Sequence, residues 1–466
     1  MSNSKKRRQL QVLILALVAV LAVLGGVAVF LTRDPGPGIS TEPSTNPPTN
    51  PPTQNTTAPT TQPTEITQPT SVPTEPPVVL SSTATISATG DMLMHMPVVN
   101  RFYRDGTYNF DGIFSCFRDY VSLADFAVGN LETTLCGLDN GYSYSGYPAF
   151  NCPDAIMDGL KNAGFDMILT ANNHSYDTNV VGMRRTLDII ADRKLLALGT
   201  GKEAGFPKFT VQNINGISVG MVCYTYNTGV SASGAVSLNG IPLSQADSKL
   251  VNSFNYRKLD SFYEKLSAQM QEMRDLGAQA IMLYIHWGDE YNTTPNATQK
   301  KMAQALCNLG VDVIVGNHAH VIQPVELLTN EQDESKKTVC LYSMGNAVSN
   351  IFKVSHFPVE TEDGLLFQVT FAKYSDGTVL LESADVLPTW VYRYYSESGT
   401  RMYTILPLDE NPESWQENMQ LTDSILKKCQ ASHQRTMGLV GPGLTDVNNW
   451  CRQTQAAVEK ALGVIN

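Results

Sequence analysis

The sequence lacks the features of a nucleic-acid-binding protein and of a small zinc or redox protein. It has 33 Lys+Arg against 44 Asp+Glu, a formal net charge of −11, and no basic block beyond the first ten residues. A surface that binds nucleic acid is therefore not expected. None of the eight cysteines forms a C-x-x-C pair, which excludes a zinc ribbon and a thioredoxin-type motif. Buried free thiols are the simplest interpretation of these cysteines.

The N-terminus has the pattern of a membrane anchor. Lys5–Arg8 precede an uncharged apolar run, Val12–Leu31, which as a helix is long enough to cross ~30 Å of hydrocarbon. The apolar region of a cleaved signal peptide is shorter, about 7–15 residues, and ends in small residues that are missing here. The excess of cations before the run predicts a single-pass protein of the cell membrane, with residues 1–9 cytoplasmic and 10–32 spanning. A cleaved signal is the alternative.

Residues 33–80 contain almost no large apolar side chain. They consist mainly of Pro, Thr, Ser, Asn and Gln, and Pro-Pro-Thr occurs twice. Such a segment has nothing to bury and is expected to be a disordered, extended stalk. Everything that follows the membrane anchor would then lie outside the cytoplasm.

The globular part, residues 81–390, alternates short apolar strands with amphipathic helices. Strands are expected at Thr83–Ala88, Phe126–Val128, Met167–Leu169, Ile217–Tyr224, Ala280–Ile285, Val311–Val315 and Val339–Tyr342. Helices are expected at Pro153–Ala163, Val180–Lys194, Leu259–Leu276 and Ala297–Leu309. This alternation predicts an α/β fold with layered sheets. Two antiparallel strands, Leu365–Phe371 and Val379–Val386, come next, and a helical extension (391–466) would hold helices at 412–430 and 445–462.

The polar residues that could carry chemistry follow these strands. Five of the seven histidines (95, 174, 286, 318 and 320) fall in the loops Thr89–His95, Gly129–Glu132, Ala171–His174, His286–Glu290 and Gly316–His320. Ligands of α/β sheets bind beyond the carboxyl ends of strands, so the five loops can converge. Together they offer a mixed nitrogen and oxygen donor set, which suits Zn, Mn or Fe better than Ca or Mg.

Each of these residues also has a structural interpretation. Asp91 could cap a turn, and Glu132 could stabilise a helix N-terminus. Asn172 and Asn173 are common in turns, and His286 could be a hydrogen-bonded core histidine beside Trp287. His318 and His320 are harder to explain structurally, because two histidines in i, i+2 positions after a buried strand form a ready ligand pair.

Six motifs in this order resemble those of the CapA family of capsule and poly-γ-glutamate biosynthesis proteins. They are Ala88–His95, Gly129–Glu132, Ala171–His174, His286–Tyr291, Gly316–Gln323 and Tyr342–Asn346, within Thr83–Ala347. The resemblance implies a calcineurin-like metallophosphoesterase fold, a layered sandwich of two packed sheets flanked by helices. An anchored domain outside the cytoplasm also fits this family.

The resemblance also implies roles for individual residues. The implied ligands of one or two divalent ions (Mn, Zn or Fe) are Asp91, Glu132, Asn173, His286, His318 and His320. His174 would be the general acid, and the additional candidates are His95, Asn130 and Glu290. Three departures from the metallophosphoesterase pattern stand out: His95 lies four residues after Asp91 instead of two, Glu132 replaces an Asp, and the last His motif has an extra residue.

Two functions from different classes follow. The first is a metal-dependent hydrolase of the cell envelope, acting on a phosphoester or on a γ-glutamyl polymer. The second is a non-catalytic subunit that handles or exports a polyanionic polymer, capsule or poly-γ-glutamate, beside a membrane synthase. A plain sugar- or peptide-binding module is a third interpretation, but it would not require the histidines to cluster.

Overall fold

In the computed structural model, structure is described for residues 78–230, 236–353, 357–411, 414–415, 419 and 421–462. The predicted cytoplasmic tail and membrane anchor, and all but the last residues of the predicted stalk, lie outside these ranges. The helices within them include none that is both long and apolar enough to cross a bilayer.

The first sheet has eight strands, in the order β20-β19-β18-β1-β4-β5-β6 with β17 beside β1. Their bounds are β1 (Leu80–Met92), β4 (Phe126–Leu131), β5 (Met167–Leu169), β6 (Leu196–Leu198), β17 (Asn346–Val348), β18 (Asp363–Tyr374), β19 (Val379–Tyr395) and β20 (Arg401–Pro407). Strands β1, β4, β5 and β6 are parallel, and β18 to β20 add an antiparallel edge. The sheet therefore joins segments from the two ends of the described chain.

The second sheet has seven strands, in the order β12-β8-β13-β14-β16-β15 with β7 beside β8. Their bounds are β7 (Phe209–Ile214), β8 (Ile217–Tyr226), β12 (Ser253–Phe254), β13 (Ala280–His286), β14 (Val313–Asn317), β15 (Ile322–Thr329) and β16 (Lys337–Met344). Its central strands β8, β13, β14 and β16 are parallel, and a helix lies between β8 and β13 and another between β13 and β14, as is usual for parallel strands.

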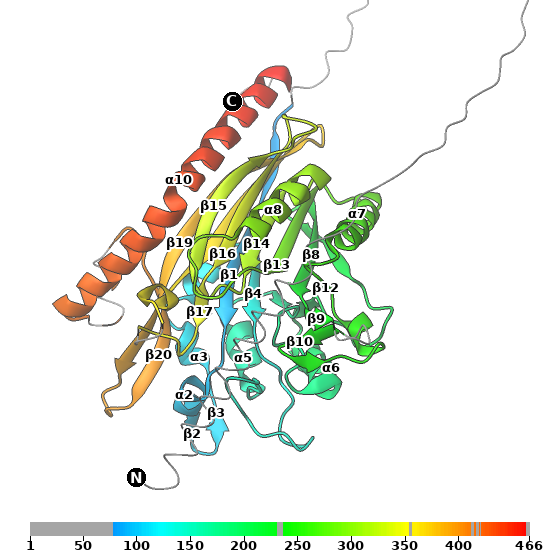
Figure 1. The fold of residues 1–466 in the computed structure, drawn as a ribbon. Helices are drawn as coiled ribbons and strands as arrows, with labels where there is room; N and C mark the ends of the chain where they lie inside the picture. The colour runs from blue at the N-terminus through cyan, green and yellow to red at the C-terminus, as the bar shows by residue number, and fades with distance from the viewer. Residues whose placement is uncertain are drawn as a thin grey trace, which may run out of the picture. The chain divides into compact units, whose positions relative to one another are not determined.

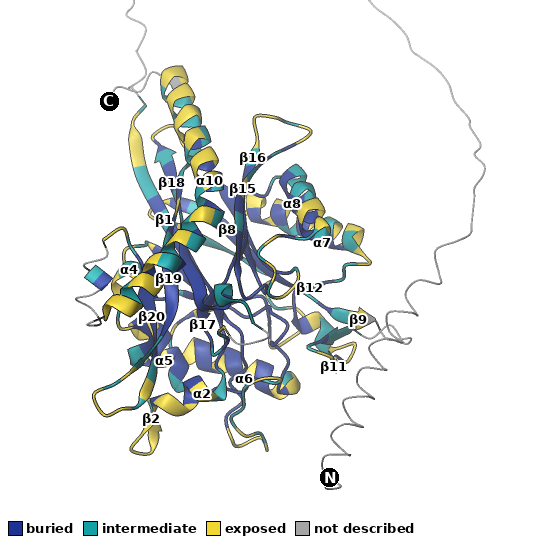
Figure 2. Cartoon of the chain, turned by 60° about the vertical axis from the view of Figure 1, so that its left-hand side comes forward, coloured by how far each residue is buried: buried dark blue, intermediate teal, exposed yellow. Residues whose placement is uncertain are grey.

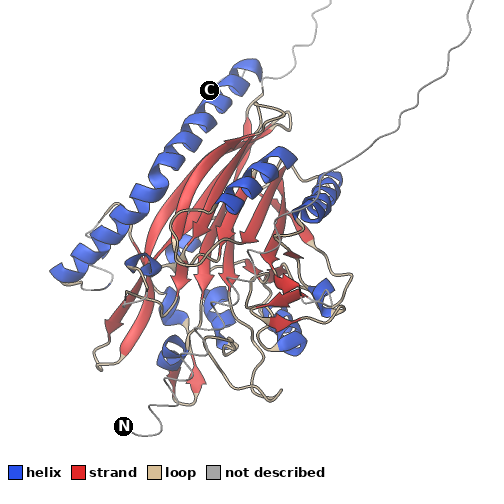
Figure 3. Ribbon diagram, viewed as in Figure 1, coloured by secondary structure: helices blue, strands red, loops and turns tan. Residues whose placement is uncertain are grey.

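The two sheets pack face to face, and alternate side chains of each strand enter the core between them. In β13, Met282 and Tyr284 lie in this core with Ile86 of β1, whereas Ile281 and Leu283 face the other way. The outer face of the first sheet packs on helices α5 (Ala155–Asn162) and α6 (Asn179–Asp192), and that of the second on α7 (Leu259–Asp275) and α8 (Ala297–Leu309). The predicted sandwich of two sheets flanked by helices is confirmed for the described residues (Figures 1 and 3).

The long helix α10 (Asp423–Leu462) lies along β19 and β15 (Figures 1 and 2). Two separate helices were predicted here, at 412–430 and 445–462, but from Asp423 onward the structure has one helix with Pro442 inside it. Packing overrides the local propensity: a Cβ on Gly443 would lie 1.9 Å from the Val325 carbonyl oxygen, so glycine permits this close approach. Residues 391–395 and 401–407 belong to β19 and β20, so the segment 391–466 also contributes to the first sheet.

The remaining elements are short. They are α2 (Met96–Val99), α3 (Asp111–Phe114), α4 (Arg118–Val121), the 3-10 helices η1 (Asn100–Phe102), η2 (Asp247–Leu250) and η3 (Val359–Glu362), and the strands β2 (Tyr103–Arg104), β3 (Thr107–Tyr108), β9 (Thr228–Val230), β10 (Val236–Leu238) and β11 (Ile241–Pro242). All eight cysteines are free and seven are buried, which confirms the interpretation as ordinary thiols.

Candidate metal centre

Two buried carboxylates lie where β1 and β4 end. Asp91 is paired in register with Asn130, whose side-chain amide donates to Asp91 Oδ1 at 2.7 Å. Glu132 comes directly after β4 and is 0% exposed. Neither of its carboxylate oxygens has a hydrogen-bond partner in the described structure. A buried carboxylate without hydrogen bonds is costly unless a cation neutralises it, so Glu132 is placed for a positively charged ligand.

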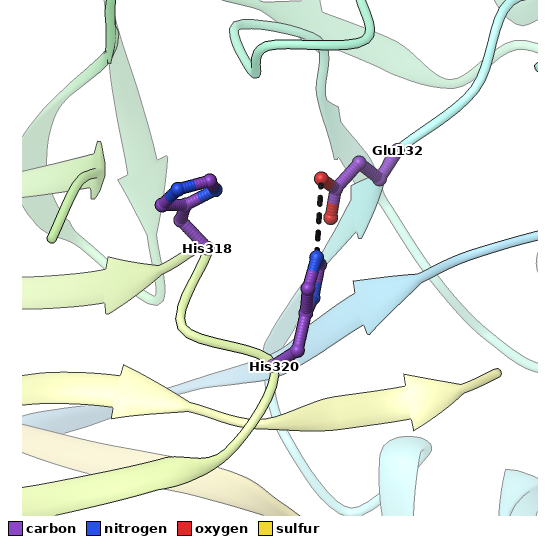
Figure 4. Close-up of side chains that lie close together, drawn as sticks. All are labelled: Glu132, His318 and His320. Atoms are coloured by element: carbon purple, nitrogen blue, oxygen red, sulfur yellow. Dashed lines mark ion pairs between the residues drawn. The ribbon is translucent and has the colours of Figure 1, made fainter. Parts of the chain in front are cut away.

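Three imidazoles surround the Glu132 carboxylate. The Nε2 atoms of His286, His320 and His174 lie 3.4, 3.9 and 4.0 Å from its Oε1. His286 ends β13, and His320 follows β14. Figure 4 shows that His318 and His320 come from one loop and that the ring of His320 points at the Glu132 carboxylate. The carboxyl ends of both sheets therefore meet around this side chain, as the loop pattern predicts.

The loop after β14 holds its two histidines in an unusual backbone conformation. His318 and His320 have φ angles of 94° and 55°, a region that non-glycine residues seldom adopt. The conformation lets the His318 backbone N–H donate to Asp91 Oδ2 at 3.2 Å while His320 Nδ1 lies 3.0 Å from the same oxygen. Such backbone strain persists where the surrounding structure enforces it, commonly at functional sites.

Two groups of side chains share Glu132. The ligand atoms of Glu132, His318 and His320 lie within 4.8 Å of one another, and so do those of Asp91, Glu132 and His286. His286 Nε2 connects the groups, 3.2 Å from His318 Nδ1. Glu132 could therefore hold a cation together with either group of donors. The orphaned Glu132 oxygens and the imidazole donors fit a divalent transition metal.

The electrostatics of the site favour the metal-binding forms of two ligands. Burial opposes ionisation of Asp91, but the hydrogen bond and charge of His320 outweigh it and hold the pKa of Asp91 below its usual value. Burial lowers the pKa of His318 well below its usual value, which keeps the ring neutral. Burial also acts against protonation of His320, but Glu132 and Asp91 raise its pKa to about 9. A metal bound at His320 would replace that proton.

His174 lies beside the carboxylates and is held by a residue that was not identified from the sequence. Its Nδ1 lies 2.7 Å from Oδ2 of Asp177, and both side chains are buried. Asp177 in turn accepts hydrogen bonds from the Phe150 N–H at 2.6 Å and from Asn239 Nδ2 at 2.8 Å. When the Nδ1–H of His174 donates a hydrogen bond to Asp177, the other ring nitrogen, Nε2, faces Glu132.

Asn173 and Tyr226 complete the surroundings of the histidines. The side-chain oxygen of Asn173 lies 2.8 Å from His286 Nε2, so the predicted amide ligand does reach the centre. The Tyr226 hydroxyl lies 3.1 Å from His318 Nε2. Burial, followed by the charge of Glu290, raises the pKa of Tyr226, which keeps its phenol protonated.

The three additional candidates take different positions. Asn130 is a hydrogen-bond donor to Asp91, as described above. His95 belongs to neither ligand group found among the described residues; its Nδ1 lies 3.2 Å from the Asn350 backbone nitrogen, and burial lowers its pKa to about 4. Glu290 is exposed and acts on His320 through its charge.

Two packed sheets with buried histidines and carboxylates at their strand ends define an α/β protein with a candidate metal centre. The family described as bacterial capsule synthesis protein PGA_cap matches residues 85–351, more than half of the chain, and the chain belongs to this family. The matched segment contains every candidate residue of the metal centre.

Two relatives carry related names. The PGA biosynthesis protein CapA of Bacillus subtilis (strain 168) is 26% identical over 316 residues, which cover 67% of this chain and 74% of the relative. The capsule biosynthesis protein CapA of Bacillus anthracis is 26% identical over 308 residues, which cover 65% of this chain and 66% of the relative. A solved structure described as a 5′-nucleotidase from Staphylococcus aureus with α-ketoglutarate has a TM-score of 0.36 at 12% identity, covering 68% of this chain and 57% of the other.

Proposed function

We propose that this chain is a metal-dependent hydrolase of the phosphoesterase type that acts in capsule or poly-γ-glutamate biosynthesis. The observation that carries the proposal is Glu132, a fully buried carboxylate with no hydrogen-bond partner among the described residues and three imidazoles within 4.0 Å. The names of the two relatives supply the biological setting.

The proposed ligands are Asp91, Glu132, Asn173, His286, His318 and His320. Bound divalent ions would acidify a water molecule and stabilise the negative charge that develops in a displacement at phosphorus or at a carbonyl. Asn130 orients Asp91 by its hydrogen bond, and Tyr226 does the same for His318. These contacts fix the donors before any substrate arrives, which lowers the cost of reorganisation during the reaction.

His174 is proposed to hold the proton that the leaving group needs, on the oxygen of a phosphoester or on the nitrogen of a γ-glutamyl amide. Asp177 accepts from Nδ1, so in the protonated ring the second proton is at Nε2, on the side of Glu132. A positioned imidazole can serve as a general acid for this step. Asp177 is a positioning residue in this scheme, because it acts on the substrate only through His174.

The alternative is a non-catalytic subunit that handles a polyanionic polymer beside a membrane synthase. The biosynthetic names of the relatives favour it, because a polymer-making system needs transport as well as chemistry. In either case we propose that residues 10–32 anchor the chain in the cell membrane, with the described domain outside the cytoplasm.

A phosphoesterase assay separates the two functions. The full-length protein in detergent is stripped with a chelator, reloaded with Mn²⁺, Zn²⁺ or Fe²⁺, and assayed with phosphomonoesters, phosphodiesters and γ-linked oligoglutamate. The hydrolase proposal predicts metal-dependent turnover that His318→Ala abolishes. His433→Ala, which removes a histidine outside the centre, should retain the activity. A protein that binds metal stoichiometrically but hydrolyses none of these substrates would favour the accessory subunit.

A further inference from the structure

A cavity with several charged lining residues lies between the β19–β20 hairpin and α10, in the part of the chain that follows the family match. Its volume is about 530 Å³. Five of its lining residues are cationic and one is acidic: Lys353, Arg393, Arg401, Lys428, Arg435 and Glu362. All of them come after residue 351, where the matched segment ends. The cavity is therefore built by Lys353, η3, β19, β20 and the long helix, and contains none of the proposed metal ligands.

Two of the five cations are paired within the fold. Arg393 lies 3.4 Å from Glu362, and Arg435 forms a fork of two 2.8 Å hydrogen bonds with Asp363. Glu360 acts on Arg435 only through its charge. Glu362 is also held by the Trp390 indole N–H at 3.3 Å and the Lys353 backbone N–H at 3.1 Å. Both carboxylate oxygens of Glu362 are therefore already bound by residues of the cavity wall.

The other three cations have no carboxylate partner. Lys353, Arg401 and Lys428 form no ion pair with any residue that the structure describes, and all three are exposed. Arg401 donates a hydrogen bond to the Tyr395 hydroxyl at 3.2 Å, and its guanidinium lies 5.7 Å from the centre of that ring. In a chain of net charge −11, three unpaired cations around one cavity create a local positive potential.

We propose that this cavity is a second binding site, for an anion that carries two or more carboxylate or phosphate groups. Guanidinium groups bind both kinds of oxyanion through two parallel hydrogen bonds, and ammonium groups add point charges. Three unpaired cations need more than one negative charge for neutralisation, which selects a multiply charged ligand over chloride or acetate. The exposed ring of Tyr395 can cover the apolar part of such a molecule.

The test is a binding titration with two probes that separate the sources of charge. Inorganic tripolyphosphate represents phosphate and hexaglutamate represents carboxylate. The full-length protein in detergent is first stripped of metal, so that neither probe can bind through an ion at Glu132. We expect saturable binding of at least one probe by isothermal titration calorimetry, and the preferred probe identifies the source.

Charge reversal locates the binding. The double variant Lys428→Glu with Arg401→Glu should weaken it by about tenfold or more, since each charge-assisted contact is worth roughly that factor. The matched control reverses two exposed lysines of α8, Lys300→Glu with Lys301→Glu, and should bind like wild type. A single Lys428→Gln variant, with its fold checked by thermal melting, serves if the double variant does not fold. Equal weakening in test and control variants, or no binding of either probe to wild type, would overturn the proposal.

Discussion

Nδ1 of His174 lies 2.7 Å from Oδ2 of Asp177, and this contact decides which ring nitrogen faces the buried carboxylate Glu132. A carboxylate only accepts, so it selects the tautomer with the proton on Nδ1. The bonds from Phe150 and Asn239 keep Asp177 from turning away. The loop after β5 thus delivers a histidine with a fixed orientation.

Replacing His174 with Ala should lower hydrolysis by about 10²–10⁴, the usual contribution of a general acid. Metal content should remain that of wild type. Asp177→Asn should lower kcat less, because the ring stays in place but its tautomer is no longer fixed. Activity and metal content of the same preparations check this prediction. A loss of metal in His174→Ala would assign that residue to the ligands instead.

Metal should stabilise the domain through Glu132. Binding at one hundred times the dissociation constant adds about 2.7 kcal/mol to the free energy of unfolding, so Tm should rise by several degrees when Mn²⁺ or Zn²⁺ is added. Glu132→Gln removes the charge that needs a cation but keeps the shape, and its Tm should not respond. Differential scanning calorimetry with and without metal measures both. An equal rise in the variant would place the effect elsewhere in the chain.

Two glycines of α10 should respond in opposite ways to alanine. At Gly443 a Cβ would lie 1.9 Å from the Val325 carbonyl oxygen, so Gly443→Ala should push the helix off β15 and cost about 1–3 kcal/mol. At Gly438 no atom lies within 4 Å of the added Cβ, and Ala should stabilise the helix by up to ~1 kcal/mol. Urea unfolding of the two variants gives the comparison. Similar midpoints would show that α10 is not held by this contact.

The proposed topology predicts that the domain is found in the membrane fraction. It also predicts that protease digests the domain when added to cells whose outer layers have been removed but whose cell membrane is intact. A soluble protein with an N-terminus beyond Thr32 would instead indicate a cleaved signal. Cytoplasmic residues 1–9 should stay protected, which an epitope placed there can report.

The layers and the convergence of the polar loops could be predicted from the sequence because both depend on local pattern. Apolar runs of strand length alternate with helical periods, and the loops after β1, β4, β5, β13 and β14 carry the polar residues. Once the strands are parallel, their carboxyl ends must meet, and Asp91, Glu132 and His318 come together without further information. The same pattern predicted that His286 lies at the carboxyl end of a strand, and it is the last residue of β13.

The rest depends on contacts between distant segments. Tyr226 reaches the centre from the end of β8 and Asn239 from the β10–β11 turn, and no local signal marks them. Asp177 could have been found from a local signal, because it follows His174 by three residues in the same loop. The sequence predicted two helices where α10 is a single one, because the contact between Gly443 and Val325, which packs the helix on β15, leaves no mark in the local sequence.

Metal analysis of the purified full-length protein tests the central claim most directly. After loading with Mn²⁺ or Zn²⁺ and desalting, plasma mass spectrometry should find at least one bound ion per wild-type chain and per His433→Ala chain. His286→Ala and His318→Ala should each retain clearly less, because each loses an imidazole that no neighbour can replace. The metal centre would be contradicted if the wild-type protein held no stoichiometric metal after loading and the histidine variants were as stable as the wild type. The polymer-handling subunit would then be the better account.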